Sequence, residues 1–392
     1  MSKESRNIVR LIARGQTNKF GNLVYDYGNK LLIAGLGAKA GFYMSLYQSG
    51  ETIVGIIFDL IGGVFADTRD RKRILVVTDL LAALATFIVW LLFSTRNAAL
   101  LVVVNIVLAI LYAFNSPTYK AIVKDLLSKA NIYRYNSYSK TISEFISVVS
   151  PLLGMFLISA LGFRAGMLVN AASFLISAAI EWRFEPIVTP KPRSALKRST
   201  LAAMRQGFGY IWHDRELMVV LVASSLINFF FAGYEFALPF TNQMGHFAHL
   251  YAYILIAESV GNIIGATLNG LWGKDLSLRQ YSHFLLGVAL PIVILPFVSF
   301  HWLVPVVLCG LSSGFMTVFN VQMFSSLQTT VAAEYLGRVF SVIFTVAILF
   351  MPVGTFFFAT FSHTSWLIFS WVGAGELVVY LVMVAVIRSG HR

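Results

Sequence analysis

Residues 60–73 read LIGGVFADTRDRKR, and this stretch decides how the chain folds. An apolar run ends at Gly62 and Gly63, and Asp67 stands just before a basic cluster that ends at Arg73. A second apolar run begins immediately afterwards. A dense basic cluster between two hydrophobic segments of membrane-spanning length is typical of a short cytoplasmic loop. The stretch therefore predicts two membrane helices joined by a tight turn.

The composition of the whole chain also indicates a membrane protein. Of its 392 residues, 57% are hydrophobic and 12% are charged, whereas about a quarter of the residues in soluble domains are charged. The formal net charge of +12 comes from Lys and Arg spread over many short loops between apolar runs. That distribution favours membrane topology over nucleic-acid binding. The single cysteine, Cys309, excludes an intrachain disulfide.

Apolar segments long enough to cross a bilayer occur at twelve places. A helix needs about 20 residues to cross the hydrocarbon core. The chain is therefore predicted to be an all-α membrane protein with twelve transmembrane helices. They are expected at residues 15–36, 42–66, 74–95, 98–117, 138–161, 164–183, 217–240, 249–273, 280–300, 302–327, 337–361 and 364–387.

The basic residues predict the orientation of these spans. The loops on one side carry nearly all of the Lys and Arg residues, while the other side has only Lys39, Arg96 and Arg164. Short loops rich in Lys and Arg stay in the cytoplasm. We therefore expect a multi-pass protein of the cell (plasma) membrane with both termini in the cytoplasm.

The longest loop, residues 184–216, divides the chain into two halves. It separates an N-terminal six-helix bundle, residues 1–183, from a C-terminal six-helix bundle, residues 217–392. The loop opens with the Pro-rich segment EPIVTPKPRS. In residues 201–217 apolar side chains recur at helical spacing, which predicts an amphipathic helix at the membrane surface.

Four of the predicted spans carry polar side chains along one face. Polar groups are costly in lipid, so they should face a water-filled cavity or a partner helix. Hydrogen bonding between helices explains any single residue of this kind, but the coincidence in the first, fourth, seventh and tenth spans favours one cavity. The candidate cavity residues are Asn22, Lys30, Asn105, Tyr112, Asn115, Asn228 and Asn320.

Acidic residues within the spans are candidates for carrying protons. Asp26 and Lys30 are four residues apart on one helix and can form an ion pair. Glu235 and Glu258 have no basic neighbour in the sequence. Burial disfavours the charged form of such a carboxyl group, so it could exchange protons near neutral pH. Glu144, about two turns into the fifth span, is the fourth candidate.

Three further acidic residues are interpreted as structural. Glu376 lies in the middle of the last span and is interpreted as a helix-packing or lipid-edge residue. Asp59 and Asp79 lie within about two turns of the cytoplasmic ends of their spans. They are expected to serve the basic turn.

The basic turn itself suggests a gate. A carboxylate at Asp67 can cap the positive N-terminal end of another helix, and the start of the eleventh span, near residues 332–341, is the natural target. Such a contact would exist only while the cytoplasmic side is closed. The alternative is that the basic residues only determine topology, which leaves Asp67 unexplained. The candidate gating residues are Gly63, Asp67, Arg71 and Arg338.

The basic turn resembles the loop between the second and third spans of major facilitator superfamily transporters, on the pattern Gly63-x-x-x-Asp67-x-x-Asp70-Arg71-Lys72. That family usually has Gly at the position of Asp70 and a basic residue at the position of Thr68. The resemblance implies two six-span halves and a cavity lined by spans 1, 4, 7 and 10.

Further segments are similar to macrolide-efflux transporters, the twelve-span drug:proton antiporter branch of this superfamily. The segment AAEYLGRVFS at residues 332–341 is fairly specific for that branch. The likeness runs in order through most of the chain. Other matching pieces are Gly15-Gln16, DRKR at 70–73, Asp79, Phe114-x-Ser116-Pro117, Ser150-Pro151-x-x-Gly154 and Pro352-x-Gly354.

The resemblance implies a secondary active transporter that exports amphiphilic organic compounds or drugs by alternating access, coupled to protons. It implies a monomer without a cofactor, whose partners are the lipid bilayer, a small amphiphilic substrate and protons, and no nucleic acid. Such antiporters often carry an arginine in the fourth span, but none occurs between Arg96 and Lys120. Proton coupling must therefore rest on Asp26, Glu144, Glu235 or Glu258.

Two alternatives stay open from the sequence. The first is a transporter of lipids, siderophores or peptides on the same fold, without the usual proton coupling. The second is a membrane enzyme or sensor, which no Cys/His ligand spacing, nucleotide-binding loop or long soluble segment supports. The chain is therefore interpreted as a transporter and not as an enzyme.

Overall fold

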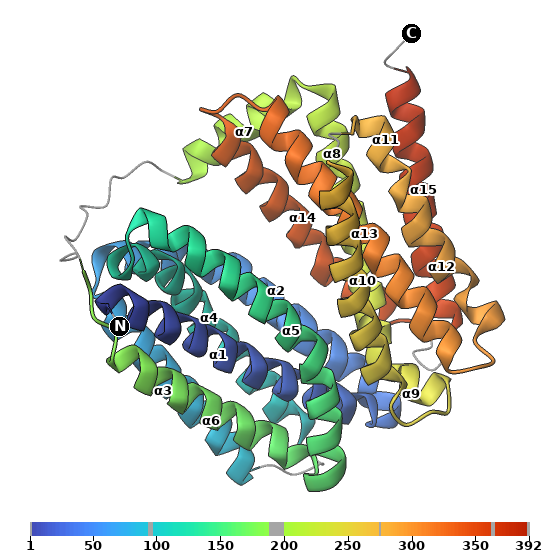
Figure 1. Cartoon of the computed structure of the whole chain (residues 1–392). Coiled ribbons are helices and arrows are strands. Elements are labelled where there is room, and N and C mark those ends of the chain that lie inside the picture. Colours follow the sequence, from blue (N-terminus) through green and yellow to red (C-terminus); the bar gives the residue numbers. More distant parts are fainter. Residues whose placement is uncertain (1, 93–96, 188–199, 274–275, 362–364, 390–392) are drawn as a thin grey trace. The chain divides into compact units, whose positions relative to one another are not determined.

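The computed structural model of the chain is built from helices (Figure 1). It describes residues 2–92, 97–187, 200–273, 276–361 and 365–389. Ten helices of this part are long and apolar enough to cross a membrane. The second helix is an eleventh if the 46° bend within it belongs to a single span.

The chain divides into two compact units, residues 1–196 and residues 197–392. The N-terminal unit contains α1 (Lys3–Ala34), α2 (Ala40–Thr68), α3 (Arg71–Leu92), α4 (Ala98–Leu126), α5 (Lys129–Leu161) and α6 (Phe163–Trp182). The C-terminal unit contains α7 (Thr200–Trp212), α8 (Arg215–Ala237), α9 (Thr241–Met244), α10 (Leu250–Trp272), α11 (Leu278–Ser282), α12 (Phe284–Val298), α13 (Leu303–Thr330), α14 (Leu336–Phe358) and α15 (Leu367–Ser389).

Helices occupy all twelve segments that the sequence predicted as spans. The largest differences lie at the polar ends, because hydropathy marks only the apolar part of a helix. Helix α1 begins at Lys3 and not near residue 15, α5 begins at Lys129 and not near residue 138, and α4 continues to Leu126. The predicted ninth span is interrupted at His283, which separates α11 from α12.

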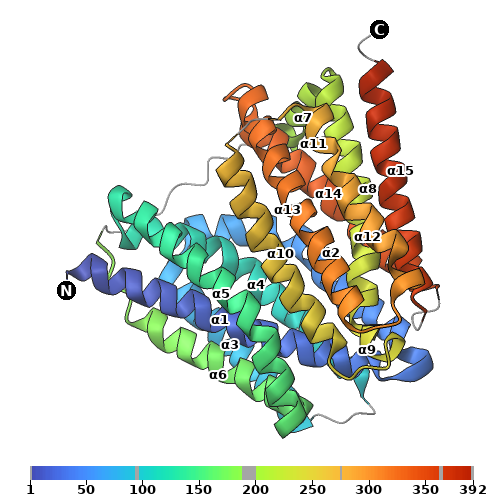
Figure 2. The ribbon, with the colours of Figure 1, turned by 45° about the vertical axis from the view of Figure 1, so that its right-hand side comes forward.

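Each unit packs its long helices in the same scheme (Figures 1 and 2). In the N-terminal unit α2 lies on α4, α1 lies on α5 and α6, and α3 lies on α4 and α6. In the C-terminal unit α10 lies on α13, α8 lies on α14 and α15, and α12 lies on α13 and α15. With the short helices α7, α9 and α11 set aside, the two sets pair the same positions in chain order.

Glycine makes the closest of these helix contacts possible. A Cβ atom on Gly62 of α2 would lie 2.0 Å from the carbonyl oxygen of Ala113 on α4. In the other unit, a Cβ atom on Gly261 of α10 would lie 2.0 Å from the carbonyl oxygen of Gly310 on α13. Small residues let membrane helices approach closely and gain van der Waals contact. The same helix pair of each unit therefore depends on a missing side chain.

The amphipathic helix predicted in the long loop is present as α7, and it packs on α14. The ring of Tyr210 stacks on Tyr335 with 4.8 Å between the ring centroids. A Cβ atom on Gly207 would lie 2.6 Å from the carbonyl oxygen of Arg338. Helix α7 is thus part of the C-terminal unit. Most of the Pro-rich segment lies outside the described residues.

The polar start of α1 is fastened to the chain that follows α6. Asn7 Nδ2 donates to the carbonyl oxygen of Glu185 at 2.8 Å. The Glu185 carboxylate accepts from Arg10 Nη1 at 2.6 Å and from Arg6 Nη2 at 2.9 Å. These hydrogen bonds, with Arg10 contributing most, lower the pKa of Glu185 from its ordinary value of 4.5 to about 2.

Replacing Gly62 by Leu should destabilise the N-terminal unit, because the new side chain meets the backbone of α4. Overpacking of this kind costs about 1–3 kcal/mol. Thermal unfolding of the purified protein in detergent measures the loss. The matched control is Gly63→Leu, since a Cβ atom there meets nothing within 4 Å. Equal unfolding temperatures for the two variants would contradict the close α2–α4 contact.

The Glu185 ion pairs should make stability depend on acid. The pKa of this carboxyl group is lower in the folded protein than in the unfolded chain, so its contribution is complete above about pH 4.5 and is lost as pH falls toward 2. Between pH 5.5 and pH 3 the wild-type protein should lose more thermal stability than Glu185→Gln. Parallel curves for the two proteins would show that these exposed ion pairs contribute nothing.

Candidate functional site

The basic turn is held by specific contacts. Arg71 donates from Nη1 to both carboxylate oxygens of Asp125, at 2.8 and 2.9 Å, and from Nε to the carbonyl oxygen of Ala66 at 2.8 Å. Its Nη2 also lies 3.5 Å from Asp67 Oδ1. The Asp125 side chain is 11% exposed and that of Asp67 is 60% exposed. Arg71 is therefore anchored by the partly buried Asp125 and also pairs with the exposed Asp67.

The neighbours of Arg71 in this turn also have structural roles. Asp70 Oδ1 accepts from the backbone N–H of Arg73 at 3.1 Å, so it caps the start of α3. This cap gives Asp70 a function at the position where the resembling family has Gly. Lys72 Nζ donates to the carbonyl oxygen of Phe184 at 3.1 Å. The basic cluster thus ties α3 to α4 and to the chain after α6, besides any effect on topology.

The structure gives the positions of the other candidate gating residues, Gly63 and Arg338, but no contact that tests their role in gating. No neighbouring helix requires a glycine at position 63, because an added Cβ atom there would meet nothing within 4 Å. Arg338 stands in the first turn of α14, with its guanidinium 5.3 Å from the ring centroid of Tyr335. The latch predicted for Asp67 stays a prediction. Its high exposure is what such a role requires.

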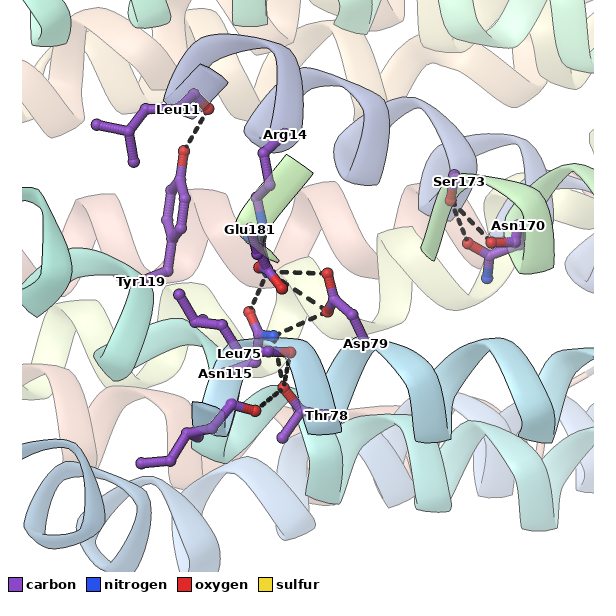
Figure 3. Close-up of polar contacts among 11 residues, drawn as sticks. Leu11, Arg14, Leu75, Thr78, Asp79, Asn115, Tyr119, Asn170, Ser173 and Glu181 are labelled. Carbon is purple, nitrogen blue, oxygen red and sulfur yellow. Dashed lines mark hydrogen bonds and ion pairs between the residues drawn. The ribbon is translucent and has the colours of Figure 1, made fainter. Parts of the chain in front are cut away.

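A charged cluster is buried where α1, α3, α4 and α6 meet (Figure 3). Arg14 of α1 donates from Nε to Glu181 Oε1 of α6 at 2.6 Å and from Nη2 to Asn115 Oδ1 of α4 at 2.7 Å. The same Nη2 lies 3.3 Å from Asp79 Oδ2 of α3. The side chains of Arg14, Asp79 and Glu181 are 5%, 2% and 0% exposed. Asp79 therefore serves this cluster and not the basic turn, and the prediction for it was wrong.

Two residues of α4 complete the cluster. Asn115 Nδ2 donates to Thr78 Oγ1 and to Asp79 Oδ1, both at 2.8 Å. The ring of Tyr119 lies under the Arg14 guanidinium, 4.4 Å from its central carbon. Both ends of the Asn115 amide are thus used inside the N-terminal unit. The structure places this residue in the interior, whereas the sequence predicted that it lines a cavity.

A second polar group of the N-terminal unit surrounds the candidate Asp26. Lys30 Nζ lies 2.8 Å from Asp26 Oδ2, as their spacing predicted. Glu51 of α2 lies near enough to interact electrostatically with both. The Asn105 amide donates to the carbonyl oxygen of Tyr47 at 2.9 Å. Sequence reasoning missed Glu51, although it is an acidic residue in an apolar span, the criterion that selected the others.

In the C-terminal unit, the candidate Glu258 has a phenol partner. Tyr234 of α8 donates its hydroxyl to Glu258 Oε1 of α10. Tyr234 is 7% exposed and Glu258 is half-buried. The thiol of Cys309 on α13 interacts with both groups. Glu235 follows Tyr234 in α8 and is half-buried as well.

Glu144 differs from the other acidic candidates. It forms an ion pair with Lys140 of the same helix, and the Lys140 side chain is 78% exposed. The Glu144 side chain itself is 31% exposed, which makes it half-buried, as Glu235 and Glu258 are. Its role as a proton carrier stays a prediction.

The polar face of α13 contacts α10 within the C-terminal unit. Ser313 and Thr317 both donate to Asn262 Oδ1, each at 2.7 Å. Hydrogen bonding between helices, the alternative that the sequence left open, accounts for these two residues. Asn320, the cavity candidate on this helix, is half-buried and is outside that pair of bonds.

The remaining cavity candidates differ in exposure. Tyr112 is 61% exposed and Asn22 is half-buried. Asn228 donates to the carbonyl oxygen of Ser224 at 2.8 Å, one turn earlier in its own helix. Their role in a cavity stays a prediction.

The structure also shows the surroundings of Glu376 and Asp59, two acidic residues that were not candidates for proton transfer. Glu376 of α15 is 3% exposed, and its Oε2 has no hydrogen-bond partner among the described residues. Helix α15 packs on α8 and α12, so Glu376 is an interior packing residue, and the lipid-edge interpretation was wrong. Asp59 of α2 faces Lys120 of α4. Within the described part of the chain, no three His, Cys, Asp or Glu side chains gather to hold a metal ion.

Sequence reasoning missed the residues that complete the charged groups of the N-terminal unit. Arg14, Asp125 and Glu181 stand where apolar segments meet loops, so hydropathy assigns them to the margins of spans. The position of Asp79 could have indicated such a cluster, because an acidic residue inside an apolar span needs a cation as its partner. A search for a basic residue at the margin of another span would have included Arg14.

Comparisons with known proteins agree with the resemblance found in the sequence. Macrolide efflux protein A of Streptococcus pyogenes is 26% identical over 333 residues, which cover 82% of this chain and 81% of that protein. The multidrug efflux pump Tap of Mycolicibacterium fortuitum is 26% identical over 354 residues, 85% of this chain and 81% of the pump.

Solved structures of transporters share the fold. A mutant of the nucleoside transporter NupG has a TM-score of 0.78 at 11% identity, covering 97% of this chain and 99% of that chain. A bacterial homologue of the iron transporter ferroportin, in an inward-facing state, has a TM-score of 0.68 at 16% identity, covering 98% of both chains. The sequence model of the Major Facilitator Superfamily matches residues 31–355. This chain therefore belongs to the Major Facilitator Superfamily.

Proposed function

We propose that this transporter exports amphiphilic organic compounds or drugs from the cell by alternating access, and that protons drive the export. The observation that carries the proposal is the alignment with two efflux proteins, which extends over more than four fifths of this chain in each case. A likeness over more than four fifths of the chain must include parts of both units.

The proposal includes twelve spans, in two halves of six, with both termini in the cytoplasm. Helix α1 is not among the ten helices that are apolar enough by composition to cross a membrane. The repeated packing scheme supports α1 as a span, because it has the place that α8 has in the other unit, and α8 is among those ten. The Asp26–Lys30 ion pair reduces the cost of inserting α1 into lipid.

We assign proton exchange to Glu258 of α10 and Glu235 of α8. The Tyr234 hydroxyl supports the carboxylate of Glu258, while the apolar helices around it favour the neutral form. In this proposal, a change in access to water loads or releases a proton on this carboxyl group. A cationic substrate also favours the carboxylate, and such mutual dependence of two ligands is reciprocal.

We assign other roles to the remaining acidic candidates. Asp26 is held by Lys30 and serves to orient groups that bind substrate. Asp125 anchors Arg71, and the exposed Asp67 is the member of this group that is free to change partners during gating. The gate and the proton site therefore lie on different helices and can be tested separately.

Glu258→Gln should abolish accumulation driven by a pH gradient while allowing downhill movement of substrate, because the amide cannot release a proton. Everted membrane vesicles with an imposed pH gradient, supplied with a labelled macrolide and separately with a cationic dye, provide the measurement. Glu144→Gln is the control and should keep gradient-driven uptake. Full gradient-driven uptake by Glu258→Gln would place proton exchange elsewhere.

Asp67→Asn and Asp125→Asn should separate gating from stability. Asp125→Asn removes a charged partner from a partly buried Arg71, which should lower the free energy of unfolding by about 2 kcal/mol. Asp67→Asn should leave thermal stability unchanged and slow transport severalfold in the same vesicles. Normal transport by a stable Asp67→Asn variant would exclude the gating role.

A further inference from the structure

We propose that the buried cluster around Arg14 is a proton-binding site, in which Asp79 and Glu181 share one proton. This inference goes beyond the proposed function, which assigns proton exchange to Glu258 in the other unit. It holds whether or not the protein exports drugs, because it rests only on contacts within the N-terminal unit.

The cluster contains one base and two acids. The Arg14 guanidinium contacts both Asp79 and Glu181, and none of the three side chains is more than 5% exposed. If both acids were ionised, one negative charge would have no counter-charge. Burial of an unpaired charge is strongly unfavourable, and proteins avoid it by neutralising the group. A neutral cluster therefore requires one proton on the two acids.

The groups that face the cluster from neighbouring helices do not supply the missing charge. Helix α4 contributes the amide of Asn115 and the phenol of Tyr119. Helix α5 contributes the phenol of Tyr135, whose oxygen lies 3.0 Å from that of Tyr119. None of these groups is a cation.

Three other basic residues of α1 and α3 have partners elsewhere. Arg10 binds Glu185. Lys19 donates to the carbonyl oxygen of Ser143 at 2.8 Å. Lys72 donates to the carbonyl oxygen of Phe184. Arg14 is thus the cation that forms ion pairs with both Asp79 and Glu181.

The geometry indicates where the proton lies. Glu181 Oε1 accepts from Arg14, whereas Glu181 Oε2 is buried and has no partner among the described residues. The carboxyl groups of Asp79 and Glu181 are within hydrogen-bonding reach of each other. Two carboxyl groups form a hydrogen bond only when one of them carries a proton. We therefore place the proton on the Glu181 carboxyl group, in a hydrogen bond to Asp79, which remains a carboxylate that accepts from Arg14 and Asn115.

Proton binding at this site should stabilise the packing of four helices. The participating side chains come from α1, α3, α4 and α6. A proton taken from water adds to one carboxylate, and its release to water leaves two like charges facing each other. Because the folded protein keeps a proton that the unfolded chain has lost, thermal stability should fall as pH rises through the release.

The pattern of neutralising substitutions tests the proposal in the purified full-length protein. Asp79→Asn and Glu181→Gln should each unfold within a few degrees of wild type, because Arg14 keeps one carboxylate. The double variant should unfold about 10 °C lower, because it leaves a buried guanidinium without a counter-charge. Two static ion pairs would predict a different result, with a large loss for each single variant and roughly their sum for the double. That result would overturn the proposal.

Infrared difference spectroscopy gives an independent readout. The carbonyl stretch of a protonated carboxyl group should be present in wild type at neutral pH and absent from both single variants. The comparison is best made in a Glu376→Gln background, because Glu376 is a second buried carboxyl group. Glu185→Gln, which changes an exposed ion pair, should keep the band. Identical spectra for wild type and Glu181→Gln would mean that no proton is held here. Neither readout needs a transport substrate.

Discussion

A polar side chain between apolar helices must find its partner inside the protein, because lipid offers none. This constraint explains why the contacts that fix the N-terminal unit are so often charged. Arg14 collects two carboxyl groups and an amide, and Lys30 pairs with Asp26. The apolar side chains give the helices their length and place them in the membrane. The buried polar groups, together with the glycines that allow close approach, help to fix which helix lies against which.

The same constraint explains how much of the fold the sequence predicts. Hydrophobic length is a local property, so the positions of the helices and the basic turn could be predicted without a structure. The pairing of Arg14 with Glu181 could not, because 167 residues separate them and both stand at the margin of a span. The partner of Arg71 was missed for the same reason. Asp125 lies beyond the predicted end of the fourth span, on a part of α4 that hydropathy does not register.

Helical periodicity identified the polar faces but not what they face. Asn115 was selected by spacing, and it forms hydrogen bonds to a neighbouring helix of its own unit, as Ser313 does on the polar face of α13. Asp26 and Glu258 were selected by charge alone, and each has a distinct partner, an ammonium group or a phenol. A stripe of polar residues therefore shows that partners are required. Only the packing of neighbouring helices decides whether the partner is another helix or water.

Helix α4 is fastened at three places, ten residues apart, which is about 15 Å along the helix axis. Asn105 binds the backbone of α2, Asn115 binds the cluster formed with α1 and α3, and Asp125 binds Arg71 at the start of α3. Ten residues are not a whole number of turns, so the three fastenings point in different directions around the axis. Helix α4 can therefore neither slide nor rotate alone without breaking one of them. Any rearrangement of α4 within the N-terminal unit must therefore begin by releasing a charged or amide hydrogen bond.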